Sequence, residues 1–220
     1  MNNIIGLIPL SGNATRMKNL PKFLLPCKPG LTLLDNTILT FKNINVFDIY
    51  AGVSDSNYNL LTQYDIDKKI INSLTMSETV KKLIESYYAK KYILIMPDTF
   101  FHIDERFNKI EKMLDDYNIV ICVWKIKDYQ VGKLGQVKLV NNEVVDIIDK
   151  DNTCKYEYAW GVIAWRSELN DLIDPTWNHI GYLINKSIEL KIPIGTIIMP
   201  GTYYDCGTYE EYFTFIKQEN

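Results

Sequence analysis

The sequence predicts an α/β protein with three layers, in which helices cover both faces of a mainly parallel, Rossmann-like sheet. Apolar runs alternate with amphipathic helical segments over the first 125 residues, and this alternation is typical of βαβ units. After residue 125 the apolar runs become shorter and more closely spaced, which predicts a small inserted β-rich lobe. A length of 220 residues with a hydrophobic fraction of 47% suits one domain with a substantial core.

The first half of the chain should contain most of the parallel sheet. The first apolar run stops at Ser11-Gly12, Ser77 is the expected N-cap of a helix, and a later run stops at Pro97-Asp98. Strands are expected at 4–10, 46–53, 69–73, 92–96 and 119–124, and helices at 35–41, 77–87 and 104–117. The crossover connections should be right-handed.

The second half should contain the inserted lobe and the C-terminal helix. Asn141-Asn142 separates two short strands and is typical of a hairpin turn. Strands are expected at 136–140, 144–148, 158–165 and 196–199, and helices at 179–190 and 209–217. No linker separates 1–125 from 126–220, so we expect the two halves to form a single domain.

Composition favours a small ligand in a reducing compartment. The net charge is −3 and the sequence has no basic block, which argues against nucleic-acid binding. The four cysteines are far apart and lack C-x-x-C spacing, so they are expected to be free thiols: Cys27, Cys122, Cys154 and Cys206. No apolar run is long enough to span a bilayer and the N-terminus lacks a basic signal region, so the expected location is cytoplasmic.

The segment after the first strand has the residues of a phosphate-binding loop. Small residues in the run Leu10-Ser11-Gly12-Asn13-Ala14-Thr15 expose backbone N–H groups, which can surround phosphate oxygens. Arg16 offers a planar fork for phosphate, and Lys22 offers a compact charge. The alternative is an ordinary βα loop with two solvated cations.

One aspartate has the chemistry of a magnesium ligand, and a second lies in a late polar segment. Asp98 follows a buried strand, at the end of the sheet where α/β proteins bind ligands, and Mg²⁺ is usually held by one or two carboxylates with phosphates and water. Asp205 comes shortly before the last helix, in Tyr203-Tyr204-Asp205-Cys206-Gly207-Thr208. Alternatively, Asp98 is a turn residue and Thr208 simply caps the helix.

Taken in order, these segments resemble the motifs of the sugar-phosphate nucleotidyltransferases. The family's G-x-G-T-R loop with its following P-K pair is matched by Gly12, Thr15-Arg16 and Pro21-Lys22, although Ala14 replaces the second glycine. Its late W-x-D-x-G-T-x-x-x-Y motif is matched by Asp205, Gly207-Thr208 and Tyr212.

The resemblance implies a set of site residues and Mg²⁺ as cofactor. Residues 1–125 would form the nucleotide-binding half, and 126–220 the substrate-binding half with the C-terminal helix. The implied catalytic residues are Arg16 and Lys22, and the implied metal ligands are Asp98 and Asp205. The implied nucleotide-binding residues are Leu10, Ser11, Gly12, Asn13, Ala14, Thr15, Thr75 and Ser77. The implied substrate-binding residues are Gly135, Asp149, Lys150, Trp160 and Gly161.

The substrate-binding half departs most from the family pattern. Asp149 stands where glutamate is usual, and Ala159-Trp160 replaces Asn-Thr ahead of Gly161. The indole of Trp160 can stack on a sugar face or on a quaternary amine, or it can be part of the core. His102 and His179 lack partners at metal-ligand spacing, so both are expected to be structural or surface residues.

The function implied is that of a magnesium-dependent nucleotidyltransferase of EC 2.7.7 type. It would transfer NMP from an NTP to a sugar 1-phosphate, release pyrophosphate and form an NDP-sugar. Three alternatives remain open: a cytidylyltransferase for a non-sugar alcohol phosphate such as phosphocholine, a GT-A-like glycosyltransferase, and an inactive relative that binds a sugar nucleotide. Asp98-Thr99-Phe100 lacks the second acid of the Asp-x-Asp motif that such glycosyltransferases carry. The expected partners are an NTP and a small phosphate, with no nucleic acid and no membrane.

Overall fold

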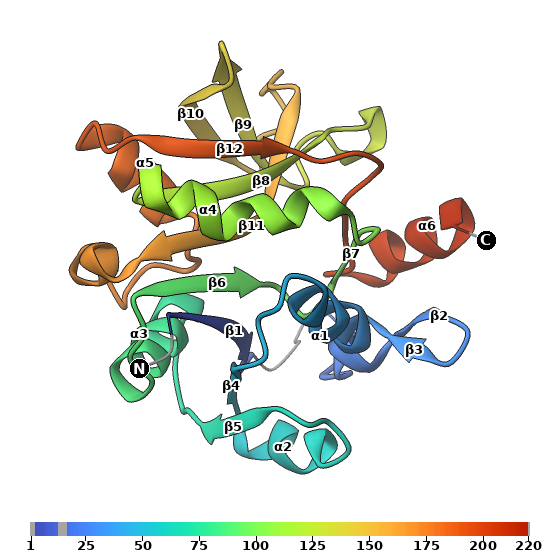
Figure 1. The fold of residues 1–220 in the computed structure, drawn as a ribbon. Helices are drawn as coiled ribbons and strands as arrows, with labels where there is room; N and C mark the ends of the chain where they lie inside the picture. The colour runs from blue at the N-terminus through green and yellow to red at the C-terminus, as the bar shows by residue number, and fades with distance from the viewer. Residues whose placement is uncertain (1–2, 13–16, 220) are drawn as a thin grey trace.

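The computed structural model describes residues 3–12 and 17–219 (Figure 1). Its main sheet has the strand order β12-β8-β11-β6-β1-β4-β5. Within the described residues all of these strands run parallel to one another except β11, which pairs antiparallel with β6 and β8. The strands are β1 (Ile4–Leu10), β4 (Ile49–Val53), β5 (Asp67–Ile70), β6 (Lys91–Ile95), β8 (Ile119–Lys125), β11 (Tyr158–Arg166) and β12 (Ile194–Ile198). The mainly parallel sheet predicted from the alternating runs is confirmed.

Helices cover both faces of this sheet because alternate strand residues point to opposite sides. Ile8 and Leu10 share one cluster of the core with α1 (Leu33–Asn43) and α4 (Lys109–Asp116). Ile5 and Leu7 share the other with α3 (Met76–Ser86) and α5 (Tyr182–Glu189). The result is the expected three-layer arrangement (Figure 1).

A β-hairpin forms the inserted lobe. Strands β9 (Gly135–Val140) and β10 (Glu143–Asp149) are joined by Asn141 and Asn142, whose φ angles are 52° and 65°. Positive φ at both central residues is the geometry of a tight type I′ turn, which matches the twist of the two strands. The hairpin attaches to β11 where Tyr158 pairs with Val137.

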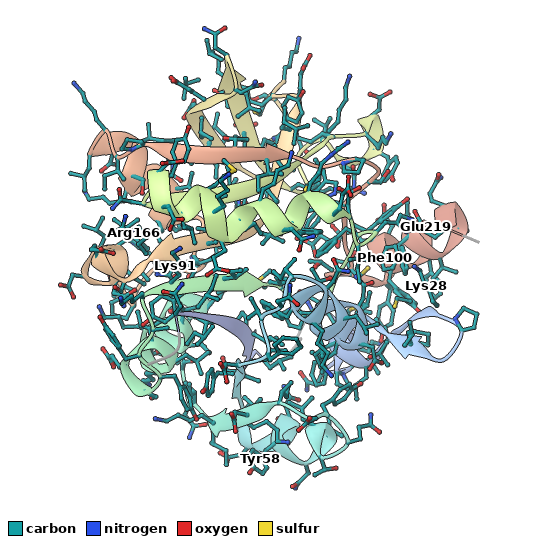
Figure 2. The ribbon with its side chains drawn as sticks, in the orientation of Figure 1. Lys28, Tyr58, Lys91, Phe100, Arg166 and Glu219 are labelled. Atoms are coloured by element: carbon teal, nitrogen blue, oxygen red, sulfur yellow. The ribbon has the colours of Figure 1, made fainter. Side chains whose placement is uncertain are left out.

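The C-terminal helix α6 (Tyr209–Glu219) fixes a second, two-stranded sheet beside the main one. Strands β7 (Thr99–Phe100) and β13 (Tyr204–Asp205) pair antiparallel. Phe215 of α6 is fully buried, with ring centroids 4.6 Å from Phe100 and 5.2 Å from Tyr204. Figure 2 shows Phe100 and Lys28 close to α6, and the Lys28 Nζ lies 5.3 Å from the centre of the Phe100 ring. This packing holds residues 98 and 205 near each other.

Several element boundaries differ from the predicted ones. Thr75, not Ser77, is the N-cap of α3: its side chain accepts a hydrogen bond from the Glu78 N–H, and Ser77 lies inside the helix. The predicted strand at 69–73 is β5 at 67–70, and the helix predicted at 179–190 begins at Tyr182. The remaining elements are short: β2 (Pro26–Lys28), β3 (Leu31–Thr32), α2 (Asp55–Tyr58), and 3-10 turns at 22–24, 59–61, 105–108, 128–130 and 167–172.

The structure describes the state of the cysteines and the character of the helices. All four cysteines are buried free thiols, as their spacing predicted. In the part of the chain that the structure describes, none of the helices is both long and apolar enough to cross a membrane.

Candidate active site

A cavity of about 830 Å³ opens where β1, β4 and β6 end, at the carboxyl edge of the parallel sheet. This is the edge at which open α/β sheets bind ligands. Its walls contain most of the predicted site residues: Leu10, Ser11, Gly12, Lys22, Thr75, Asp98, Gly135, Asp149, Lys150, Trp160 and Asp205. The predictions for Asn13, Ala14, Thr15 and Arg16 lie outside the described residues.

Asp98 and Asp205 come together because the β7–β13 ladder aligns the segments that carry them. Asp205 pairs with Thr99 across the ladder, and the Cys206 N–H donates to the Asp98 carbonyl at 2.9 Å. Burial, together with the nearby charge of Asp98, raises the pKa of the Asp205 carboxyl to about 6. The charge of Asp98 therefore disfavours the ionised form of Asp205 in this cavity.

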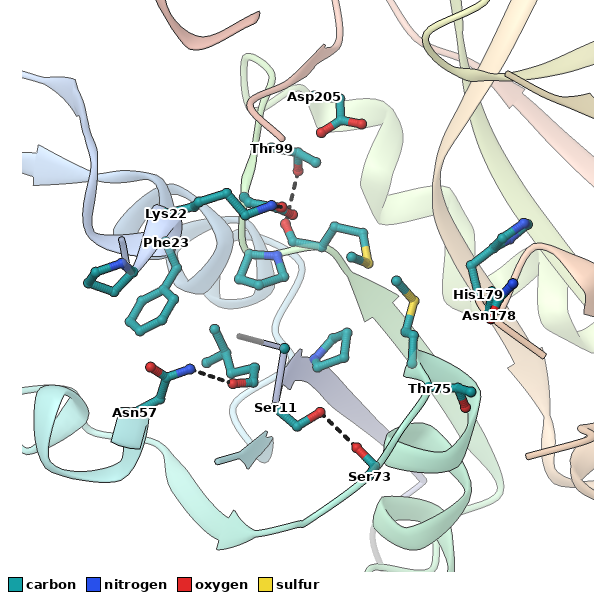
Figure 3. A pocket seen from close by; sticks show the side chains of 18 of the residues that line it. Ser11, Lys22, Phe23, Asn57, Ser73, Thr75, Thr99, Asn178, His179 and Asp205 are labelled. Atoms are coloured by element: carbon teal, nitrogen blue, oxygen red, sulfur yellow. Dashed lines mark hydrogen bonds and ion pairs between the residues drawn. The ribbon is translucent and has the colours of Figure 1, made fainter. Parts of the chain in front are cut away.

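Each carboxylate has a lysine beside it. The Lys22 Nζ lies 2.5 Å from the Asp98 Oδ2, with both side chains about 15% exposed. The Lys150 Nζ lies 3.6 Å from the Asp205 Oδ2. Lys150 follows β10 in the left-handed region, at φ 50°, and its N–H donates to the Leu134 carbonyl. Figure 3 shows Lys22 and Asp205 on the same side of the cavity.

The donor set fits a magnesium ion that shares its coordination with substrate. No group of three or more acidic, histidine or cysteine side chains that could hold a metal occurs among the described residues. Mg²⁺ does not need such a cage, since it is commonly held by one or two carboxylates with phosphate oxygens and water. A cation between Asp98 and Asp205 would also relieve their mutual repulsion, so the residues present fit the predicted cofactor.

The hydroxyl groups of Ser11 and Ser73 line the cavity next to the end of β1. The Ser11 Oγ lies 3.0 Å from the Ser73 Oγ and 2.5 Å from the Thr79 Oγ1, and the last two oxygens are 2.6 Å apart. The Asn57 Nδ2 donates to the Leu10 carbonyl at 2.9 Å. These bonds tie the end of β1 to the segments after β4 and β5, as Figure 3 shows for Ser11, Ser73 and Asn57.

Two of the predicted nucleotide-binding residues, Thr75 and Ser77, lie in different environments. Thr75 lines the cavity, but its hydroxyl also donates to the Pro175 carbonyl at 2.5 Å. Ser77 is fully buried in α3 and is not part of the cavity wall. Its Oγ has no hydrogen-bond partner among the described residues. The geometry thus places Ser73 rather than Ser77 beside the cavity.

Trp160 is part of the cavity wall, and glycines make room for its ring. A Cβ on Gly135 would collide with the indole nitrogen, and a Cβ on Gly181 would come within 2.7 Å of the ring. Gly161 is buried against the Tyr203 ring and is not part of the cavity wall. The indole is therefore held by close backbone contacts that only glycine permits at these positions.

His179 also lines this side of the cavity, which differs from its expected role as a structural or surface residue. Its Nε2 lies 3.5 Å from the Asp149 Oδ2. Burial lowers the pKa of His179, although the neighbouring Asp149 acts in the opposite direction. A neutral imidazole leaves the negative charge of Asp149 free to interact with a ligand. His102, in contrast, pairs with Glu219 on α6, 2.7 Å away.

Sequence reasoning missed several polar residues of the cavity wall, among them Asn57, Ser73, Asn178 and His179. None of them belongs to a motif with recognisable spacing. They meet only because the segments after β4 and β5 and the segment before α5 converge on one edge of the sheet. A one-dimensional pattern carries no signal for that convergence.

Comparisons with known proteins find the fold but no close relative. No protein-family model matches the sequence, and no curated protein matches it. A proposed glucose-1-phosphate thymidylyltransferase from Bacillus anthracis, solved in complex with a sucrose, superposes with a TM-score of 0.85 at 15% identity. That match covers 98% of this chain and 94% of the other.

A UTP-bound UGPase from Acinetobacter baumannii superposes with a TM-score of 0.77 at 13% identity. The match covers 100% of this chain and 93% of the other. Both neighbours are sugar-phosphate nucleotidyltransferases, and the chain shares their fold along nearly its whole length.

Proposed function

We propose that this chain is a nucleotidyltransferase that transfers NMP from an NTP to a sugar 1-phosphate and releases pyrophosphate, which gives an NDP-sugar. The observation that carries the proposal is one continuous cavity that contains two adjoining lysine–aspartate pairs, Lys22–Asp98 and Lys150–Asp205, and has the Trp160 ring in its wall. Joining two phosphorylated substrates needs both charge neutralisation and room for two ligands. The fold shared with two sugar-phosphate nucleotidyltransferases supports the same reaction.

In the proposed reaction an acceptor phosphate oxygen attacks the α-phosphorus of the NTP in line. A new P–O bond forms, the bond between the α-phosphorus and its bridging oxygen breaks, and that oxygen leaves with pyrophosphate. No side chain needs to act as a nucleophile, because positioning and charge neutralisation supply most of the catalysis in phosphoryl-type transfer. Lys22 would neutralise the α-phosphate, and Lys150 would orient the acceptor phosphate.

Two further roles complete the proposed site. Arg16, which lies outside the described residues, is assigned by the family resemblance to the departing pyrophosphate. Asp98 and Asp205 would hold Mg²⁺, which when bound would supply positive charge against the substrate phosphates. Both lysines would then exchange their carboxylate partners for phosphate oxygens as the metal and substrates enter.

The acceptor side of the cavity has an apolar platform next to an acid. The Trp160 indole and the Asp149 carboxylate would bind the non-reacting part of the acceptor, the ring by stacking and the acid by accepting hydrogen bonds from hydroxyls. The same pair of groups suits a quaternary ammonium group. Phosphocholine therefore belongs in the acceptor panel beside the sugar 1-phosphates.

The test is a pyrophosphate-release screen of the four common NTPs, each with Mg²⁺, against sugar 1-phosphates and phosphocholine. We expect release that needs an NTP and one acceptor class together, with the joined product seen by mass spectrometry. Asp98→Ala and Asp205→Ala should each abolish release. Full activity of both variants would falsify the metal assignment.

The same screen separates the rival activities. A glycosyltransferase would consume a preformed sugar nucleotide and release NDP, and no pyrophosphate would appear. An inactive binding relative would bind a nucleotide or sugar nucleotide tightly without turnover for any pair. Either result would overturn the proposed function.

A further inference from the structure

Two loops from opposite halves of the cavity meet at its rim. Residues 73–76, ahead of α3, line the nucleotide side, and Asn178 and His179 line the acceptor side. The Thr75 hydroxyl donates a hydrogen bond to the Pro175 carbonyl at 2.5 Å, across 100 positions of sequence. Figure 3 shows Thr75 on the wall that faces Asn178 and His179. This bond therefore links the loop that carries Thr75 to the loop that carries the acceptor-side residues.

The nucleotide-side loop is anchored firmly enough to act as a support. The Leu74 N–H donates to the Glu78 Oε2 at 2.7 Å, and the Lys82 Nζ donates to the Asn72 carbonyl at 2.8 Å. Glu78 and Lys82 also pair with each other, 2.8 Å apart, one turn along α3. The first turns of α3 thus hold the loop at both ends.

The acceptor-side loop is closed mainly on itself. Asp174 accepts hydrogen bonds from the N–H and the hydroxyl of Thr176, at 2.8 and 2.7 Å, and its carbonyl accepts one from the Trp177 N–H. These bonds fix the shape of the turn. Trp177 and Ile180 pack into the same core cluster as α3, and the bond from Thr75 holds the exposed Pro175 against the nucleotide half.

The single hydrogen of the Thr75 hydroxyl is used by a structural contact. It goes to the Pro175 carbonyl, while the hydroxyl oxygen accepts the Glu78 N–H at 3.0 Å as the N-cap of α3. A hydroxyl has one hydrogen to donate, so the same group cannot also donate to a nucleobase. Donation to a base therefore does not explain its position on the cavity wall.

We propose that Thr75 is a positioning residue for the acceptor: its hydrogen bond to Pro175 holds the 174–179 loop, and with it Asn178 and His179, against the nucleotide half of the cavity. The inference rests on the proposed function, since it assigns the acceptor to that side. Loss of the bond should weaken acceptor binding and leave NTP binding largely intact.

Three variants separate the two hydrogen bonds of Thr75. Thr75→Ser keeps both the cap and the donor and is the matched control. Thr75→Asp keeps the cap, because a carboxylate caps helices well, but an ionised carboxylate has no hydrogen to donate. Thr75→Val loses both and adds no charge. An effect of the donor must therefore appear in the Asp and Val variants and be absent from the Ser variant.

The steady-state readout is the KM for the acceptor compared with the KM for the NTP. The Asp and Val variants should raise the acceptor KM about three- to tenfold, the range that corresponds to one net hydrogen bond. Thr75→Ser should stay within twofold of the wild type, and the Val variant should change the NTP KM by less than twofold. An unchanged acceptor KM in both the Asp and Val variants overturns the proposal.

Hydrogen exchange of the amides at 174–181 tests the same bond without turnover. Faster exchange in the Asp and Val variants, and wild-type exchange in the Ser variant, would support the proposal even if no acceptor were turned over. Equal exchange in all four proteins would overturn it. An inactive wild type with the expected exchange pattern would count against the proposed function alone, so the two failures are distinguishable.

Discussion

Replacing Asp205 with asparagine should stabilise the metal-free protein at pH 8 while removing activity. The Asp205 side chain is only 21% exposed and lies beside Asp98. These surroundings raise its pKa from 3.8 to about 6, whereas the unfolded chain keeps the ordinary value. Near neutral pH the Asp205 carboxylate is therefore less stable in the folded protein than in the unfolded chain, which lowers the free energy of unfolding. Asparagine has nearly the same shape and no such charge.

The size of this effect follows from the shift in pKa. A shift of about two units corresponds to about 3 kcal/mol of unfolding free energy. Because the folded-state pKa is raised, this stability is fully present below about pH 4 and is lost as the pH rises through about 6. Asp205→Asn should therefore unfold about 5 to 10 °C higher than the wild type at pH 8. The advantage should fall to about half at pH 5.

Thermal unfolding followed by circular dichroism, with EDTA at pH 8 and pH 5, measures this difference. Asp171→Asn is the control, because the Asp171 side chain is fully exposed. Its nearest charged partner, the Lys81 Nζ, is 4.0 Å away, so the ion pair is weak. That variant should stay within about 0.5 kcal/mol of the wild type. Excess Mg²⁺ should stabilise the wild type more than Asp205→Asn. A variant that is less stable than the wild type at pH 8 without metal would refute the reasoning.

Three other substitutions test the rest of the site. Lys22→Met should lower kcat for pyrophosphate release by about a hundredfold or more, because it removes the fixed charge that the proposed mechanism directs at the reacting phosphate. An unchanged kcat would exclude this role of Lys22 in neutralising the phosphate. Trp160→Ala should lower kcat/KM for the acceptor by about tenfold or more and leave the NTP KM within twofold, because the apolar platform is lost. Equal effects on both substrates would contradict this role of Trp160. Phe215→Ala should destabilise the protein by about 3 to 5 kcal/mol in urea unfolding, because a fully buried ring packed on Phe100 and Tyr204 is removed.

The sheet was predictable because parallel strands that are buried on both faces appear in the sequence as continuous apolar runs. The strands β1, β6 and β8 fall within one residue of their predicted bounds for this reason. The exposed strand β5 was displaced, since Asp67 to Lys69 carry no apolar signal. The cap of α3 was missed although Thr75-x-x-Glu78 has the spacing of a capping box. Ser77, the predicted N-cap, lies three residues before Val80, the first apolar residue of the helical spacing.

The candidate site was predictable where a side chain follows directly from its strand. Asp98 comes after β6, and parallel strands direct their carboxyl ends to one edge, so its place in the cavity needed no tertiary information. Ser73 and His179 come from segments whose positions depend on how α3 and α5 pack. Their approach to the cavity is a property of the tertiary structure, and local sequence patterns cannot predict it.

The acceptor side shows why a residue-by-residue comparison with a family motif can mislead. In the sequence, tryptophan at position 160 looks like the loss of a hydrogen-bonding side chain. In the structure the indole needs the space that Gly135 and Gly181 leave, from two other segments of the chain. The tertiary structure thus accommodates the Trp160 ring with three segments of the chain, and replacing this residue alone with a small polar one should leave a void between them.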